Sequence, residues 1–191
     1  MTNKIQEANL AMVVSKTFSG LNVNALRYLL PLWIAPLTGV TFRCVFAAVA
    51  FWIIGYWAKP ETASVKDKIY LFLLGAVGIY GYMFSYLMGL SKTTPVSAAI
   101  FTSMQPIWVF ILSVFFFNEK ATVMKIVGIL VGLGGALLCI STQKSDDLAS
   151  DAFSGNLFCL VSSVIYAVYL ILSNRFLKRT GPYTLMRYTF S

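Results

Sequence analysis

Long apolar runs constrain this chain more than any other feature of its sequence. A hydrocarbon layer about 30 Å thick is crossed by about 20 residues in a helix. Inside such a layer the backbone must satisfy its own hydrogen bonds, so runs of this length predict membrane-spanning helices. Six stretches are long and apolar enough, at residues 9–34, 37–58, 69–90, 96–117, 123–141 and 156–177.

Composition agrees with a membrane location. Of the 191 residues, 58% are hydrophobic and only 12% are charged. A soluble domain is typically about a quarter charged. We therefore predict an all-α, polytopic transmembrane bundle that forms a single membrane domain over residues 1–191, embedded in a lipid bilayer as a multi-pass protein. The connections between spans are short, so we expect no separate soluble domain.

The positions of the basic residues predict the orientation of the bundle. With the N-terminus in the cytoplasm, nine Lys and Arg residues lie in inside segments and two, Lys92 and Lys144, lie outside. Such a bias in short loops indicates an N-in topology in the plasma membrane. It also accounts for the net charge of +8, so we expect no nucleic-acid partner. The inside residues are Lys4, Lys59, Lys66, Lys68, Lys120, Lys125, Arg175, Lys178 and Arg179.

The sequence offers little for catalysis or for metal binding. It contains no histidine, and none of its seven acidic residues lies within a predicted span. Its three cysteines, Cys44, Cys139 and Cys159, lie in apolar runs without metal-ligand spacing, which predicts buried thiols. We therefore expect no enzyme activity, no metal and no cofactor.

Three cations nevertheless fall inside the predicted spans. Lys16 and Arg27 are eleven residues apart, close to three helical turns, so they share one helix face with Asn22 and Asn24 between them in sequence. Arg43 lies seven residues into the second span, at a depth similar to that of Arg27. Charges at such depth usually face a wet cavity or the protein interior, although long side chains near helix ends can also reach the interface. Without acidic partners, these cations could meet backbone carbonyls, water or an anionic solute.

Polar residues of the third and fourth spans could complete such a cavity. Tyr82 lies in the third span, and Thr102 and Gln105 lie one turn apart in the fourth. Pro106 should kink the fourth helix because it removes one backbone hydrogen bond. These side chains could line a solute path or could hold helices together through hydrogen bonds. The candidate solute-binding residues are Lys16, Asn22, Asn24, Arg27, Arg43, Tyr82, Thr102 and Gln105.

The fifth span carries a different pattern. Its sequence "GILVGLGGA" combines a GxxxG motif with two further glycines and lacks polar side chains until its end. Small residues let helix backbones approach closely, so this span should pack within the fold or between the protomers of a homodimer. The packing residues are Gly128, Gly132, Gly134 and Gly135.

An internal repeat is also visible. "NLAMVVS" at 9–15 matches "NLFCLVS" at 156–162 in four of seven positions, and "APLT" at 35–38 is echoed by "GPYT" at 181–184. The sixth span thus restarts the pattern of the first, after five spans. An odd number of spans per repeat places the two copies in opposite orientations, an arrangement typical of secondary transporters.

The chain also resembles a known family. "LSKTTPVSAAIFTSMQPIWVF" and the following glycine-rich span look like the fourth and fifth helices of EamA-type transporters of the drug/metabolite transporter superfamily. "GLNVNALRYLLPLWIAPLTGVTFRCVFAA" is similar to the first hairpin of that family. The resemblance implies a ten-helix exporter or importer of small metabolites with cytoplasmic termini. This chain would hold the first repeat, about 9–150, and the start of the second, 151–191.

Three functions are therefore weighed. The first is a transporter of small solutes, such as amino acids or other anionic or zwitterionic molecules, that works by alternating access. The second is a non-transporting membrane fragment or assembly partner. The third, an intramembrane enzyme, lacks a histidine, a membrane carboxylate or a paired nucleophile and base.

Overall fold

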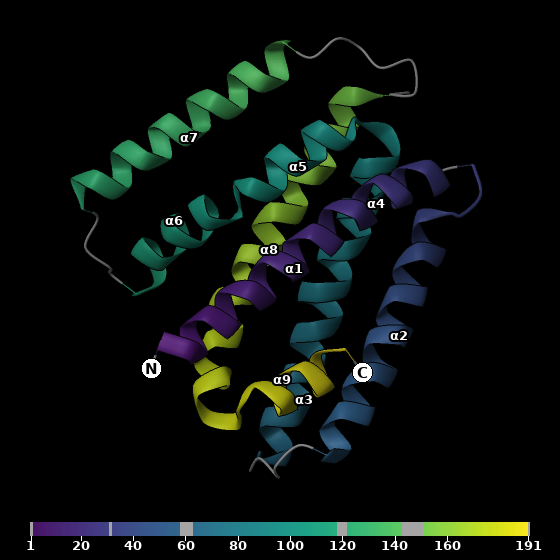
Figure 1. Cartoon of the computed structure of the whole chain (residues 1–191), viewed down its shortest axis with the longest axis vertical. Helices are drawn as coiled ribbons and strands as arrows, with labels where there is room; N and C mark the ends of the chain where they lie inside the picture. The colour runs from purple at the N-terminus through teal and green to yellow at the C-terminus, as the bar shows by residue number, and fades with distance from the viewer. Residues whose placement is uncertain (1, 31, 58–62, 118–121, 143–150, 191) are drawn as a thin grey trace.

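The computed structural model of the chain is built of helices and describes residues 2–30, 32–57, 63–117, 122–142 and 151–190 (Figure 1). No strand occurs within these residues. The helices are α1 (Thr2–Leu29), α2 (Pro36–Trp57), α3 (Val65–Leu74), the π-helix η1 (Gly75–Tyr80), α4 (Gly81–Lys92), α5 (Pro95–Ser103), α6 (Gln105–Phe117), α7 (Val123–Thr142), α8 (Ala152–Thr180) and α9 (Pro182–Thr189).

Helical structure covers most of each predicted span, although α1 ends at Leu29, before the predicted end of the first span at residue 34. Four of the predicted spans are long and apolar enough to cross a membrane. These four are Pro36–Trp57, Val65–Lys92, Pro95–Phe117 and Ala152–Leu177. The fifth predicted span contains a shorter apolar helical stretch, Val123–Cys139. The first predicted span forms α1, which is long but interrupted by polar and charged residues, and it is not among the four.

The third and fourth predicted spans are continuous helical segments with local irregularities. Three glycines lie at or next to η1, which joins α3 to α4 without a loop. α5 ends at Ser103 and α6 begins at Gln105, so the helix is interrupted two residues before Pro106. At the start of α5, the Thr94 hydroxyl accepts a 3.1 Å hydrogen bond from the Ser97 amide, and Pro95 occupies the first turn.

α8 packs along α4 and forms the centre of the structure (Figure 1). Small residues permit this close approach. A Cβ atom on Gly89 would lie 2.5 Å from the Cys159 sulfur, and one on Gly155 would lie 2.8 Å from the Thr93 backbone nitrogen. Ser162 and Ser163 of α8 are almost fully buried, and their hydroxyls donate to carbonyls of their own helix. Small residues thus allow α4 and α8 to pack closely along each other.

Two polar contacts show which helix ends meet. Arg179 near the end of α8 forms a 3.8 Å ion pair with Asp67 at the start of α3. At the opposite end of these helices, the Thr93 hydroxyl lies 2.7 Å from the Asn156 side-chain oxygen, within hydrogen-bonding distance. Segments assigned by the sequence to the same side of the membrane thus lie together at each end.

α9 follows α8 after a sharp turn and packs against α2 and α3. The turn is made at Gly181, whose φ of 83° favours glycine, and Pro182 then opens the new helix. The Arg187 guanidinium stacks on the Trp52 ring, with its carbon 3.6 Å from the ring centroid. α9 is thereby held against the end of α2.

α7 differs from the central helices because it lies at the edge of the structure (Figure 1). A Cβ atom on Gly128, Gly134 or Gly135 would meet nothing within 4 Å, and one on Gly132 would lie 3.6 Å from an Ile107 side-chain carbon. Close packing by these glycines therefore does not occur inside the described fold. Cys159 is buried as predicted, but Cys139 on α7 is exposed, because few neighbours cover that helix.

Candidate functional site

One pocket gathers most of the polar residues that the sequence singled out. It has a volume of about 360 Å³ and lies between α1, α2, α4 and α5. This volume falls in the range of small-molecule sites, about 300–1,000 Å³. From α1 and α2 it is lined by Lys16, Ser19, Gly20, Asn22, Val23 and Arg43. From α4 and α5 it is lined by Tyr82, Met83, Tyr86, Ala99, Thr102 and Ser103.

Two cations give this pocket its electrostatic character. Arg43 is half-buried and Lys16 is exposed, and neither forms a hydrogen bond or ion pair with any residue that the structure describes. None of the residues that line the pocket is acidic. The positive charge of the site is therefore not neutralised by its lining, and the pocket should attract anions.

Arg27 occupies a different environment from the one that the sequence favoured. Its guanidinium donates two 3.0 Å hydrogen bonds, to the backbone carbonyls of Leu90 and Ser91 in the last turn of α4. A cation at this end of a helix stabilises the unpaired carbonyls and the negative end of the helix dipole. Arg27 is not among the pocket-lining residues, so backbone carbonyls hold it rather than a cavity shared with Arg43.

The remaining candidates divide between the pocket and its surroundings. Asn22, Tyr82 and Thr102 line the pocket. Asn24 does not, and its side-chain amide donates a 3.1 Å hydrogen bond to the Gly20 carbonyl. Gln105 does not line the pocket either, although it begins α6 three residues after Thr102.

Two tyrosines outside the predicted set belong to the same region. Tyr86 lines the pocket one helical turn after Tyr82, and its side chain is buried. The four-residue spacing of Tyr82 and Tyr86 was a usable sequence signal, because such residues share a helix face. Tyr166 of α8 packs on Tyr82 with ring centroids 4.6 Å apart. Nothing in the sequence indicated this pairing between distant helices.

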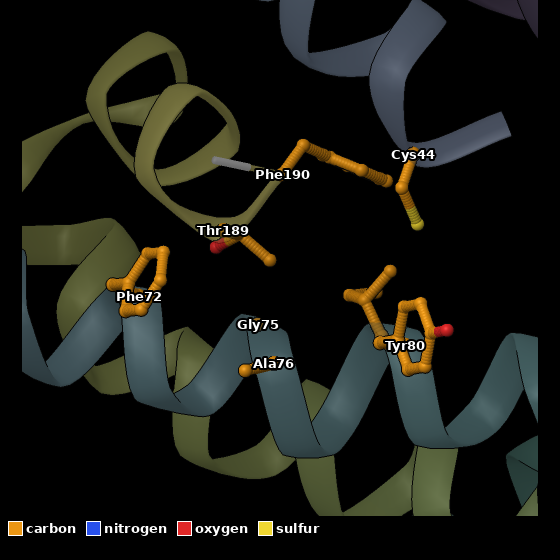
Figure 2. A pocket seen from close by; sticks show the side chains of 8 residues that line it. Cys44, Phe72, Gly75, Ala76, Tyr80, Thr189 and Phe190 are labelled. Carbon is orange, nitrogen blue, oxygen red and sulfur yellow. The ribbon is translucent and has the colours of Figure 1, made fainter. Parts of the chain in front are cut away.

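A second cavity, of about 220 Å³, lies between α2, η1 and α9 (Figure 2). Its walls are mostly apolar, and in Figure 2 Cys44, Tyr80 and Phe190 approach it from three different elements. It contains neither a lysine nor an arginine among its lining residues. Cys44 and Arg43 are adjacent in α2 but line different cavities, so of these two described cavities the one that includes Arg43 carries the positive charge.

Comparisons with known proteins identify the family of the chain. The model of the EamA-like transporter family matches residues 6–141. The uncharacterized transporter YyaM of Bacillus subtilis (strain 168) is 26% identical over 175 residues, which cover 90% of this chain and 57% of that protein. The aromatic amino acid exporter YddG of Ancylobacter novellus is 27% identical over 105 residues, which cover 54% of this chain and 37% of the exporter.

A solved crystal structure shares the fold. It superposes with a TM-score of 0.55 at 21% sequence identity, and the match covers 93% of this chain and 64% of the other. At this identity the likeness concerns the arrangement of helices alone. The chain spans 57% of the length of YyaM and 37% of the length of YddG.

Proposed function

The chain belongs to the EamA-like transporter family, and from this premise we propose that it takes part in moving small solutes across the plasma membrane by alternating access. Its solutes would be amino acids or other small anionic or zwitterionic molecules. The name of YddG, an aromatic amino acid exporter, is consistent with solutes of this size. The bound solute would occupy the pocket between α1, α2, α4 and α5.

The observation that carries this proposal is the unneutralised charge of Arg43 beside a pocket of solute size. Arg43 is half-buried within α2, one of the helices long enough to cross a membrane. An ionised group inside a bilayer is costly and is typically found where it contacts a substrate or a wet cavity. A guanidinium also suits a carboxylate, because its planar fork can donate two parallel hydrogen bonds. Arg43 would therefore bind the anionic group of the solute.

The proposal includes a topology of six spans with a cytoplasmic N-terminus, in which α1 and α7 join the four helices of sufficient length and apolarity. α8 would start an inverted second repeat. The contacts between Asp67 and Arg179 at one end and between Thr93 and Asn156 at the other support this arrangement. The bias of Lys and Arg toward one set of loops supports its orientation.

Uptake into liposomes tests the function. The chain is reconstituted, and uptake of radiolabelled pyruvate, phenylpyruvate and phenylalanine is measured separately against protein-free liposomes. We expect uptake of at least one of these solutes. Arg43→Leu should reduce this uptake about tenfold or more, because a hydrogen bond to a charged group is worth about 1.5–3 kcal/mol. Arg43→Lys should reduce it less, since the charge remains but the fork is lost.

The control for this experiment is Arg179→Leu, which removes an arginine outside the pocket whose side chain is 61% exposed. It should leave uptake unchanged. Removal of one charge from the membrane interior should not impair insertion of Arg43→Leu. Unchanged uptake by Arg43→Leu would contradict the proposal, and loss of the folded protein would assign Arg43 a structural role.

Cysteine labelling tests the orientation, in a background in which the three native cysteines are replaced by serine. A membrane-impermeant thiol reagent added to intact cells should label Lys144→Cys, in the segment proposed to lie outside. It should label Lys66→Cys only after the cells are opened. Labelling in the reverse order would show that the N-terminus lies outside.

A further inference from the structure

A row of four tyrosine rings connects the pocket to the centre of the fold. The ring centroids of Tyr82 and Tyr86 lie 6.1 Å apart, those of Tyr82 and Tyr166 lie 4.6 Å apart, and those of Tyr166 and Tyr169 lie 6.0 Å apart. The first two rings belong to α4 and line the pocket, while the other two belong to α8 and lie outside its lining. The row therefore ends in an aromatic wall of the pocket.

The rings of this wall are held in place. Tyr86 is only 6% exposed, and the Tyr82 ring packs on the rings of both Tyr86 and Tyr166. An aromatic face that is fixed before binding loses little conformational freedom when a flat group stacks on it. Such stacking is favourable for a planar ring in an offset or edge-to-face arrangement. The wall therefore fits a planar apolar group better than a flexible chain.

The charged side chains of the pocket lining are of one sign only. They belong to Lys16 and Arg43, and apart from the tyrosines the other polar side chains of the lining, those of Ser19, Asn22, Thr102 and Ser103, are uncharged. A carboxylate here would meet two cations. An ammonium group would meet the same two cations with no acidic side chain in the lining to offset the repulsion. The pocket is thus built for an anion and against a zwitterion.

From the aromatic and cationic residues of this lining we infer that the pocket selects aromatic monocarboxylates that lack an ammonium group, such as aromatic 2-oxo acids. The carboxylate binds Arg43, and the ring packs against the parts of Tyr82 and Tyr86 that line the pocket. This inference rests on the proposed function, since it names the solute class of the same site. It goes beyond that proposal by excluding zwitterionic amino acids and by assigning recognition of the aromatic ring to the tyrosines.

Binding to the chain in lipid nanodiscs tests this inference, with three radiolabelled probes measured by equilibrium dialysis. Phenylpyruvate carries both features, pyruvate lacks the ring, and phenylalanine has an ammonium group in place of the 2-oxo group on the same carbon skeleton. We expect phenylpyruvate to bind about tenfold more tightly than either of the others. Tyr82→Leu should bring the affinities for phenylpyruvate and pyruvate to within about threefold of each other, whereas Tyr82→Phe should preserve the preference.

The matched control is Tyr70→Leu, which removes a tyrosine of α3 that stacks on Phe176 with centroids 4.7 Å apart, outside the pocket lining. It should leave the ratio of affinities unchanged. If Tyr82→Leu lowers thermal stability but leaves the ratio intact, the tyrosine row only packs helices and the inference is wrong. Phenylalanine binding as tightly as phenylpyruvate would also overturn it.

The outcomes separate this inference from the function on which it rests. Equal binding of phenylpyruvate and pyruvate, abolished in both cases by Arg43→Leu, would remove the aromatic selection and keep the anion site. Binding of the probes that does not depend on Arg43 would overturn both proposals. The absence of binding by all three probes would have the same consequence.

Discussion

Glycine residues have opposite surroundings in two parts of this molecule. At the α4–α8 contact, Gly89 and Gly155 lie against another helix so closely that a Cβ atom on either would come within 3 Å of neighbouring atoms. On α7, Gly128, Gly134 and Gly135 face open space, with nothing within 4 Å of such an atom. The helix with more glycines, α7, is thus the one that is packed less closely against its neighbours.

The two sets of glycines differ in whether another helix faces them, not in the glycine pattern of the sequence. A GxxxG motif permits close approach, but it needs a facing helix of complementary shape. α8 supplies that surface to α4, with Gly155, Cys159, Ser162 and Ser163 all buried. α7 has few neighbours in the described structure. Isolated glycines with a partner therefore matter more to this fold than a run of glycines without one.

The largest effect should come from Gly155→Leu. A side chain at this position would collide with the backbone of Thr93 and Lys92. Overpacking typically costs about 1–3 kcal/mol, and a clash with backbone rather than a flexible side chain should reach the upper end or exceed it. We expect a marked loss of folded protein in size-exclusion chromatography and a lower melting temperature in detergent.

The matched control is Gly128→Leu, which introduces the same residue on α7, where nothing lies within 4 Å. Its yield and melting temperature should stay close to those of the unchanged chain. Equal loss in both variants would indicate that leucine is harmful wherever it replaces a helical glycine. The close contact at Gly155 would then not explain the loss of stability.

A smaller effect should follow from Arg27→Leu. This change removes both hydrogen bonds to the Leu90 and Ser91 carbonyls at the end of α4. A cation at a partly buried helix C-terminus contributes up to about 2 kcal/mol. The expected result is a lower melting temperature with phenylpyruvate binding retained in the folded fraction, since Arg27 does not line the pocket.

Arg27→Lys provides the graded comparison, because it keeps the charge but has fewer donors for two carbonyls. Its melting temperature should lie between those of Arg27→Leu and the unchanged chain. Loss of solute binding at an unchanged melting temperature would contradict the structural role. It would return Arg27 to the solute site that the sequence favoured.

Much of this fold could be predicted from hydropathy and helix signals. The predicted span at 37–58 coincides with α2 (Pro36–Trp57), and the one at 96–117 with the segment Pro95–Phe117. Apolar length fixes such boundaries because each polar connection must leave the hydrocarbon layer. Hydropathy could not predict the π-helix η1 or the packing of α9, since both depend on contacts with distant residues.

The site was predictable to a more limited extent. Lys16, Gly20 and Val23 of α1 all line the pocket, because helical periodicity brings them to one side of the helix. The same face also contains Arg27, but the length of its side chain lets it reach α4 instead of the pocket. The similar predicted depths of Arg27 and Arg43 suggested a shared environment. In the structure, Arg27 instead contacts backbone carbonyls at the end of α4. Helical periodicity predicts which residues share a helix face, but the tertiary structure determines which residues they contact.

The smallest effect should come from Gly134→Ile, which changes one of the glycines that the sequence assigned to close packing. In the described structure this position has open space, so isoleucine should change the stability of a single chain by only about 0.5 kcal/mol. The melting temperature at low protein concentration in detergent should therefore be unchanged. The remaining role for this face is contact between two copies of the chain, where a bulky branched residue would keep the backbones apart. Crosslinking in membranes distinguishes these cases: a crosslinked dimer that is present in the unchanged chain and lost in Gly134→Ile would assign the glycines to a homodimer. An identical crosslinking pattern in both would leave the α7 glycines without a packing role in this protein, unlike Gly155.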